Sequence, residues 1–147
     1  MIATAVVPSS TSPPLPRLRH EVHHAQWLKG HDARLKDPTS EKSEQPAYAK
    51  NDVRSVRPDL LVLIGICTHL GCLPKQRFEK AVPELGADWP GGFFCPCHGS
   101  KFDLAGRVFQ GSPASVNLRV PPYSFTTDTM LVIGVDPKGE SSSKGAA

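Results

Sequence analysis

The feature that most constrains this chain is a pair of short segments that together hold all four of its cysteines. Residues 67–72 read Cys-Thr-His-Leu-Gly-Cys, and residues 95–100 read Cys-Pro-Cys-His-Gly-Ser. Each segment also holds one histidine and follows a predicted strand, residues 60–66 and 91–94 respectively. Because strands deliver the loops that follow them to one end of a sheet, we expect the two segments to lie side by side.

Six side chains in these segments could bind a metal, since each segment offers two thiols and one imidazole. A structural zinc ion takes four ligands. Zinc would therefore leave two side chains unused, or would be accompanied by a disulfide. A binuclear iron–sulfur cluster also takes four protein ligands, and in one variant two imidazoles replace two thiolates on one iron. The residue types alone leave both chemistries open.

The rest of the sequence predicts an all-β domain. The 147 residues include 15 prolines and 12 glycines, which favour short strands and turns over a helical bundle. We predict short antiparallel strands over residues 59–136. They include an alternating strand at 116–120 and hairpin turns at 104–105 and 127–129. Residues 1–26, which contain a Ser/Pro-rich stretch, and residues 137–147 are expected to be disordered tails.

Charge and hydropathy exclude several classes of protein. The net charge is only +3, with acidic and basic residues interspersed, so nucleic acid is not expected as a partner. The longest apolar stretch, residues 60–66, falls well short of the roughly 20 residues that span a membrane. The N-terminus lacks the basic region of a signal peptide. We therefore expect no membrane anchor and no export signal in this sequence.

A second histidine motif lies near the N-terminus. Residues 20–24 read His-Glu-Val-His-His and formally match the zinc-protease pattern His-Glu-x-x-His. That pattern needs a stable helix and a third ligand, whereas this one follows a proline-rich stretch and has no evident third ligand. A solvated polar segment is the better interpretation.

The paired segments closely resemble those of the Rieske iron–sulfur proteins of quinol–cytochrome c reductase, the cytochrome bc1 complex. The resemblance covers residues 28–135 and includes Asp-Trp-Pro-Gly-Gly at 88–92 and Val-Pro-Pro-Tyr at 120–123. The polar segment 75–88 resembles an insertion of proteobacterial members. The resemblance implies a Rieske-type antiparallel β-sandwich over residues 27–136. A small cluster-binding subdomain, at about 66–115, would be inserted in a base domain.

The resemblance also assigns the six side chains in pairs. The inner iron of one [2Fe-2S] cluster would be bound by Cys67 and Cys95, and the outer iron by His69 and His98. The two remaining cysteines, Cys72 and Cys97, would form a disulfide that clamps the loops together.

Other site residues follow from the same resemblance. Ser100 would donate a hydrogen bond to a cluster sulfide, which raises the reduction potential. Phe102 stands where many members have a tyrosine that donates to a ligand sulfur, so we expect a lower potential here. Leu70 and Gly71 would form the tip that docks on cytochrome b. Residues 111–115 read Gly-Ser-Pro-Ala-Ser where the family has Gly-Pro-Ala-Pro, which predicts a looser cover over the cluster.

The function implied is that of the iron–sulfur subunit of a respiratory oxidoreductase, not a stand-alone enzyme. It would take an electron from ubiquinol, with a proton accepted by His98, and pass the electron to cytochrome c1. The partners would be cytochrome b and cytochrome c1. The location would be the periplasmic face of the bacterial inner membrane, with membrane association through the complex.

The alternative function is a soluble Rieske-type ferredoxin that delivers electrons to an oxygenase. Ferredoxins generally lack the second cysteine of each segment, and this chain has both, Cys72 and Cys97. A terminal oxygenase would need a mononuclear iron domain, for which the chain is too short.

Overall fold

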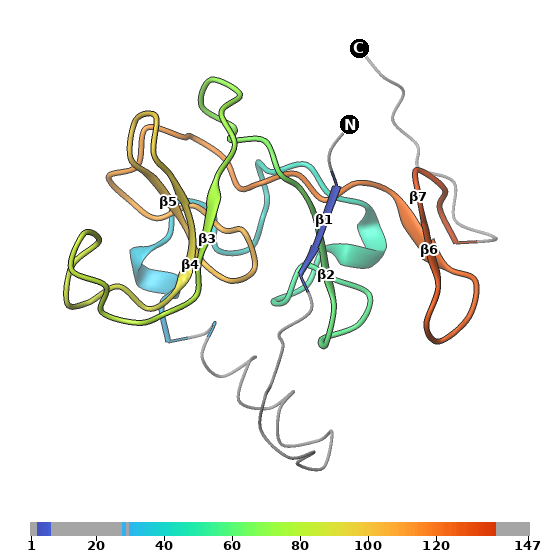
Figure 1. Ribbon diagram of the computed structural model, residues 1–147. Coiled ribbons are helices and arrows are strands. Elements are labelled where there is room, and N and C mark those ends of the chain that lie inside the picture. The colour runs from blue at the N-terminus through green and yellow to red at the C-terminus, as the bar shows by residue number, and fades with distance from the viewer. Residues whose placement is uncertain (1–2, 7–27, 29, 138–147) are drawn as a thin grey trace.

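Short antiparallel strands make up the regular structure of the computed structural model, which describes residues 3–6, 28 and 30–137. They pair into three small sheets, with orders β1-β2, β3-β4-β5 and β6-β7 (Figure 1). The elements in chain order are β1 (Ala3–Val6), the 3-10 turns η1 (Asp32–Arg34) and η2 (Ala47–Ala49), β2 (Leu61–Ile64), β3 (Lys75–Arg77), β4 (Gly92–Cys95), β5 (Ser100–Phe102), β6 (Tyr123–Phe125) and β7 (Leu131–Ile133). The all-β prediction is confirmed.

The strands position the two cysteine segments. The first segment begins three residues after the end of β2. The second segment connects β4 to β5, whose register places Cys95 directly opposite Ser100. Both segments are therefore loops that start from ordered strands, as the sequence predicts.

One apolar core joins elements of all three sheets. It combines the buried strand β2 with side chains of β4, β5 and β6 and with two of the four cysteines. Its members of lowest exposure include Val62, Phe102, Val108, Leu118, Tyr123 and Cys95. The loops that carry the cysteines are thus fixed at their bases by the same core that holds the sheets together.

The expected N-terminal tail differs from the structure at residues 3–6. This segment forms β1 and pairs antiparallel with β2, with Ala3 opposite Ile64 and Val6 opposite Leu61. Such pairing satisfies backbone groups that would otherwise leave an edge of β2 open. The other residues predicted to be in the two tails lie outside the described residues, apart from residue 137.

The predicted strand at 116–120 is wrong. Its backbone forms hydrogen bonds with three different segments instead of with one neighbouring strand. Leu118 N–H donates to Gly106 O at 2.8 Å, and Val120 N–H donates to Glu44 O at 3.0 Å. Arg119 O accepts from Ile64 N–H at 2.8 Å. The apolar alternation was real, but it reflects burial between irregular segments and not a sheet ladder.

The predicted turns are confirmed. Residues 104–105 form the turn after β5, where Gly106 N–H donates to Asp103 O at 3.0 Å. Residues 127–129 lie in the bend between β6 and β7. The chain returning from the first turn meets β5 only in an isolated bridge between Phe102 and Val108, so no full strand forms there.

Polar side chains organise the irregular segment that precedes β2. The buried Asp37 carboxylate accepts hydrogen bonds from Glu41 N–H at 2.7 Å, Lys42 N–H at 3.0 Å and Ser43 Oγ at 2.7 Å. Burial raises the pKa of this carboxyl, but these hydrogen bonds together outweigh burial and hold the pKa below its ordinary value of 3.8. The charged form of Asp37 is therefore favoured in the folded protein.

We expect Asp37→Asn to destabilise the fold by about 1–3 kcal/mol at neutral pH, because charge-assisted hydrogen bonds are lost in a buried site. A folded-state pKa that is lowered contributes stability above the unfolded value and loses it as pH falls. The difference between parent and variant should therefore shrink below about pH 3.8. Urea unfolding at several pH values measures this. Asp88→Asn, at an exposed surface ion pair, is the control and should change little. An equal difference at all pH values would contradict the assignment.

Candidate metal centre

The two cysteine segments fold into the same kind of turn. Gly71 N–H donates to Cys67 O at 3.0 Å, and Gly99 N–H donates to Cys95 O at 2.9 Å. The two glycines have φ values of +84° and +83°, a left-handed conformation that glycine adopts without strain. Each turn therefore starts at a cysteine and closes at a glycine, with a histidine in between.

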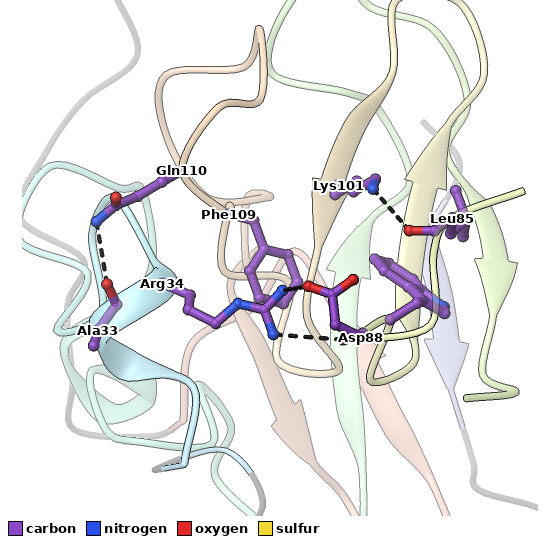
Figure 2. A pocket seen from close by; sticks show the side chains of 8 residues that line it. Ala33, Arg34, Leu85, Asp88, Lys101, Phe109 and Gln110 are labelled. Carbon is purple, nitrogen blue, oxygen red and sulfur yellow. Dashed lines mark hydrogen bonds and ion pairs between the residues drawn. The ribbon is translucent and has the colours of Figure 1, made fainter. Parts of the chain in front are cut away.

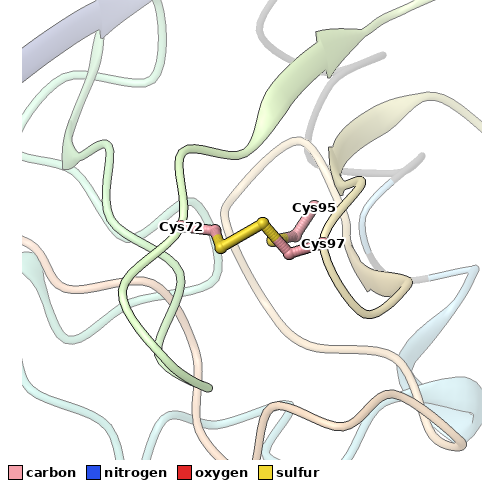
Figure 3. Close-up of side chains that lie close together, drawn as sticks. All are labelled: Cys72, Cys95 and Cys97. Atoms are coloured by element: carbon pink, nitrogen blue, oxygen red, sulfur yellow. A yellow bond between two sulfur atoms is a disulfide. The ribbon is translucent and has the colours of Figure 1, made fainter.

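A disulfide joins one turn to the other (Figure 3). Cys72 and Cys97 are bonded with their Cα atoms 6.5 Å apart, so the predicted pairing is confirmed. The sulfur of Cys95 lies beside this bond, within 4.8 Å of both bonded sulfurs. Because disulfide sulfurs are not thiolates, these three atoms do not form a three-thiolate metal site.

The two remaining cysteines are free thiols that face each other. Cys67 and Cys95 are buried, and their side chains lie close enough to influence one another's ionisation. Burial raises the pKa of the Cys95 thiol, and the neighbouring thiol adds to this. The N–H groups of Cys97 and His98 point at the same sulfur and oppose the rise. Metal binding here would release thiol protons, and the two N–H groups would then stabilise a thiolate.

The two histidines also lie together. Their ring centroids are 4.9 Å apart and the rings are nearly perpendicular. His69 Nδ1 is buried and has no hydrogen-bond partner among the described residues. Since buried polar atoms almost always have a partner, this nitrogen suits a metal ligand. His98 is exposed. Two buried thiols and two adjacent imidazoles fit the donor set of a Rieske cluster.

The remaining predicted site residues lie around these donors. Ser100 is fully buried, and its Oγ accepts a hydrogen bond from Ala114 N–H at 3.0 Å. Phe102 is fully buried in the same core as the two free thiols. Leu70 is 69% exposed, and Gly71 beside it is exposed as well. The first loop therefore presents an apolar tip to solvent.

Two residues that contact this region were not singled out in the sequence. Thr68 Oγ1 donates to Val116 O at 2.7 Å, and the Lys36 ammonium donates to carbonyls of residues 112 and 114. Thr68 carries no motif of its own inside its segment. Lys36 is one of 17 lysines and arginines and lies 31 positions before the first cysteine. Neither contact has a sequence signal.

A pocket of about 260 Å³ lies elsewhere, and none of its lining residues is a cysteine or a histidine (Figure 2). Arg34 crosses it, stacks 5.4 Å from the centre of the Phe109 ring and forms an ion pair with Asp88 at 2.8 Å. Lys101 Nζ donates to Leu85 O at 3.0 Å. These contacts fasten the segment 75–88, predicted to be a surface insertion, to the rest of the domain.

Two further sequence expectations concern the N-terminal histidine motif and membrane-spanning segments. The His-Glu-x-x-His motif at 20–24 lies outside the described residues. Within the described part of the chain, no helix is long and apolar enough to cross a membrane.

Comparison with known proteins agrees with this geometry. The family model described as "Rieske [2Fe-2S] domain" matches residues 31–123. This is more than half of the chain, and it includes both cysteine segments. The chain belongs to the Rieske [2Fe-2S] domain family, and the prediction of a [2Fe-2S] cofactor is confirmed at the level of the family.

Similar proteins come from bacteria and mitochondria. The chain is 55% identical over 109 residues to the ubiquinol-cytochrome c reductase iron-sulfur subunit of Allochromatium vinosum, covering 74% of this chain and 53% of that protein. Identity to the corresponding subunit of Rhodospirillum rubrum is 47% over 102 residues, covering 69% and 51%. Identity to the mitochondrial cytochrome b-c1 complex subunit Rieske of Theropithecus gelada is 51% over 81 residues, covering 55% and 26%. The chain spans about half the length of the two bacterial relatives.

The disulfide is expected to stabilise the metal centre. It closes a loop with a sequence separation of 25, and chain entropy alone assigns such a crosslink about 3–4 kcal/mol. We expect Cys72→Ala to lower the free energy of unfolding by about this amount and to speed loss of the visible cluster absorbance.

The double variant Cys72→Ala/Cys97→Ala is the control, because it removes the crosslink without leaving a new thiol. It should behave like the single variant. A double variant that matches the parent in stability and in cluster retention would show that the crosslink is dispensable.

Proposed function

We propose that this chain is the cluster-bearing part of a ubiquinol–cytochrome c reductase. The observation that carries the proposal is the disulfide between Cys72 and Cys97 beside two free buried thiols. Soluble Rieske-type ferredoxins generally lack these second cysteines. The relatives named above, with 47–55% identity, are subunits of this reductase or of the cytochrome b-c1 complex.

The proposed ligands are Cys67 and Cys95 for one iron and His69 and His98 for the other. Supporting this assignment, the two thiols are buried and lie against each other, while the two imidazole rings meet edge to face, with His98 exposed and His69 half-buried. When bound, the cluster supplies a one-electron acceptor. Burial around the thiols opposes a charged sulfur, whereas the N–H groups of Cys97 and His98 directed at Cys95 favour one at that position.

His98 is the proposed contact for the quinol. Its side chain is exposed, whereas His69 is half-buried with its Nδ1 enclosed. If Nδ1 of His98 faced the metal, Nε2 would carry the remaining ring proton. Metal binding makes that proton more acidic, and once it is lost Nε2 could accept the hydrogen bond of the quinol hydroxyl. One proton would move to this nitrogen as one electron enters the cluster. The other electron and proton of the quinol would leave by a separate acceptor.

Partners and location follow from the same proposal. The exposed tip formed by Leu70 and Gly71 would dock on cytochrome b, with Leu73, which is 57% exposed, extending its apolar surface. The electron would then pass to cytochrome c1. The chain would work at the periplasmic face of the bacterial inner membrane as part of a respiratory complex.

The reduction potential separates the two candidate functions. Rieske centres span about −150 to +300 mV. A quinol-oxidising subunit requires a midpoint near the upper end, and a ferredoxin that feeds an oxygenase requires one near the lower end. We expect an EPR-monitored redox titration of the cluster-loaded chain to give a high midpoint. A midpoint near −150 mV would favour the ferredoxin.

We expect His98→Cys to separate cluster binding from quinol reactivity, because a thiolate can replace the ligand but not the exposed nitrogen. The cluster signal should remain in part, while the rate at which ubiquinol reduces it falls to background. The rate is measured in membranes that contain cytochromes b and c1. His69→Cys is the matched control, and at equal cluster content it should retain more activity. Full quinol oxidation by the His98 variant would refute the assigned role.

The absence of a hydroxyl at Phe102 is expected to keep the potential below that of a tyrosine-bearing relative. Phe102→Tyr should raise the midpoint by about 20–60 mV, the equivalent of one additional hydrogen bond to a ligand sulfur. Phe109→Tyr, in the separate apolar cluster around Trp89, should leave the midpoint unchanged. Redox titration of both variants measures this, and an unchanged or lower midpoint in Phe102→Tyr would contradict the expectation.

A further inference from the structure

A third loop contacts both cysteine segments. We call residues 111–116 the cover loop. Thr68 Oγ1, in the first segment, donates to Val116 O at 2.7 Å. Ser100 Oγ, in the second segment, accepts from Ala114 N–H at 3.0 Å. A displacement of the cover loop would therefore be transmitted to both segments.

The cover loop is also tied to the start of β5. Ser112 Oγ accepts from Lys101 N–H at 3.0 Å and is within hydrogen-bonding distance of Lys101 O at 3.2 Å. Ala114 is fully buried in the core that contains the two free thiols. The loop thus packs against the buried side of the metal centre. The sequence predicts a looser cover from the loop's single proline, whereas these contacts hold the loop in place.

Lys36 holds the cover loop from a distant part of the chain. Its Nζ donates to Ser112 O at 2.6 Å and to Ala114 O at 2.8 Å, across 76 and 78 residues of sequence. Its own backbone is fixed, because Lys36 N–H donates to Val108 O at 3.0 Å. Hydrogen bonds from a charged donor are roughly twice as strong as neutral ones. The ammonium therefore acts as a two-point clamp on the loop.

Within the described residues, Lys36 forms no ion pair. Its ammonium donates hydrogen bonds to backbone carbonyls instead. A lysine that served only surface solubility would extend into water. Here a positive charge is held next to the loop that covers the metal centre. A nearby positive charge favours the more negative, reduced form of a redox group.

Ser100 provides the link from the clamp to the metal centre. Its oxygen already accepts from Ala114 N–H, and no acceptor among the described residues takes its hydroxyl hydrogen. A hydroxyl has one hydrogen to donate and its orientation follows the bonds that the oxygen accepts. The position of Ala114 therefore sets the direction in which Ser100 can donate.

We propose that Lys36 is a positioning residue of this metal centre. By clamping the carbonyls of Ser112 and Ala114, it fixes the cover loop so that Ser100 is oriented to donate toward the cluster. It thereby raises the reduction potential without touching the cluster. This role is independent of the physiological electron donor, so it stands even if the proposed quinol function fails.

The experiment is an EPR-monitored redox titration of the cluster-loaded chain with three substitutions. Lys36→Met keeps the length of the side chain and removes both the charge and the donors. We expect this variant to have a lower midpoint potential. The equilibrium constant for reduction should fall about tenfold, which is equivalent to about 59 mV for one electron. Lys36→Arg keeps a charge and several donors and should retain most of the potential. Lys50→Met removes the same charge from a surface pair with Glu41 and should change little.

A double-mutant cycle tests the route through Ser100. In a Ser100→Ala background, Lys36→Met should lower the midpoint much less than it does in the parent, because the hydroxyl that it positions is gone. Fully additive effects would overturn the positioning role. So would an unchanged midpoint in Lys36→Met, or an equal fall in Lys50→Met.

Hydrogen exchange gives a readout that is separate from the potential. In the cluster-loaded chain, the Ala114 amide should exchange faster in Lys36→Met than in Lys36→Arg, since the clamp restrains the loop. Equal protection in the two variants would overturn the clamp. Should Lys36→Met fail to load a cluster, Lys36→Gln replaces it in the titration, and an unchanged midpoint in that variant would also overturn the proposal.

Discussion

The metal centre depends on the covalent bond between Cys72 and Cys97. Within each cysteine segment, a backbone hydrogen bond closes its own turn, whereas the disulfide joins one turn to the other. The two turns start from different sheets, β2 and β4, and their outer residues are exposed. A crosslink between such loops stabilises the fold mainly by restricting the unfolded chain. It also keeps the two buried thiols, and the two imidazoles that meet edge to face, on facing loops.

Buried polar groups hold the irregular parts of the domain in place. The strands are only three or four residues long, so many backbone groups find partners outside a ladder. Arg107 illustrates this, since it is buried in an ion pair with Asp103 and also donates to Leu28 O. Asn117 does the same by donating to Asp37 O and accepting from Val108 N–H. The segment before β2 is thereby attached to the loops that surround the metal centre.

In this construction a buried interior lies beneath exposed loop residues. The thiols belong to the core, while His98 and the tip around Leu70 reach solvent. A buried sulfur environment limits water around a cluster, and an exposed imidazole permits contact with a proton donor. The segment 75–88 is also attached to the rest of the domain, because Trp89 Nε1 donates to Arg77 O at 3.0 Å and Lys101 Nζ donates to Leu85 O at 3.0 Å.

The sequence by itself located the candidate ligands, because thiols, imidazoles and turn glycines recur at short spacings within two segments, and the resemblance of these segments to a known family indicated the [2Fe-2S] chemistry. It also determined the all-β class and both hairpin turns, which depend on local proline, glycine and apolar patterns. It missed β1, whose pairing with β2 spans more than 50 residues, and it mistook residues 116–120 for a strand. Only the tertiary structure decided where Lys36 and Thr68 bond, because a long-range hydrogen bond from one side chain to a backbone carbonyl leaves no periodic pattern in the sequence.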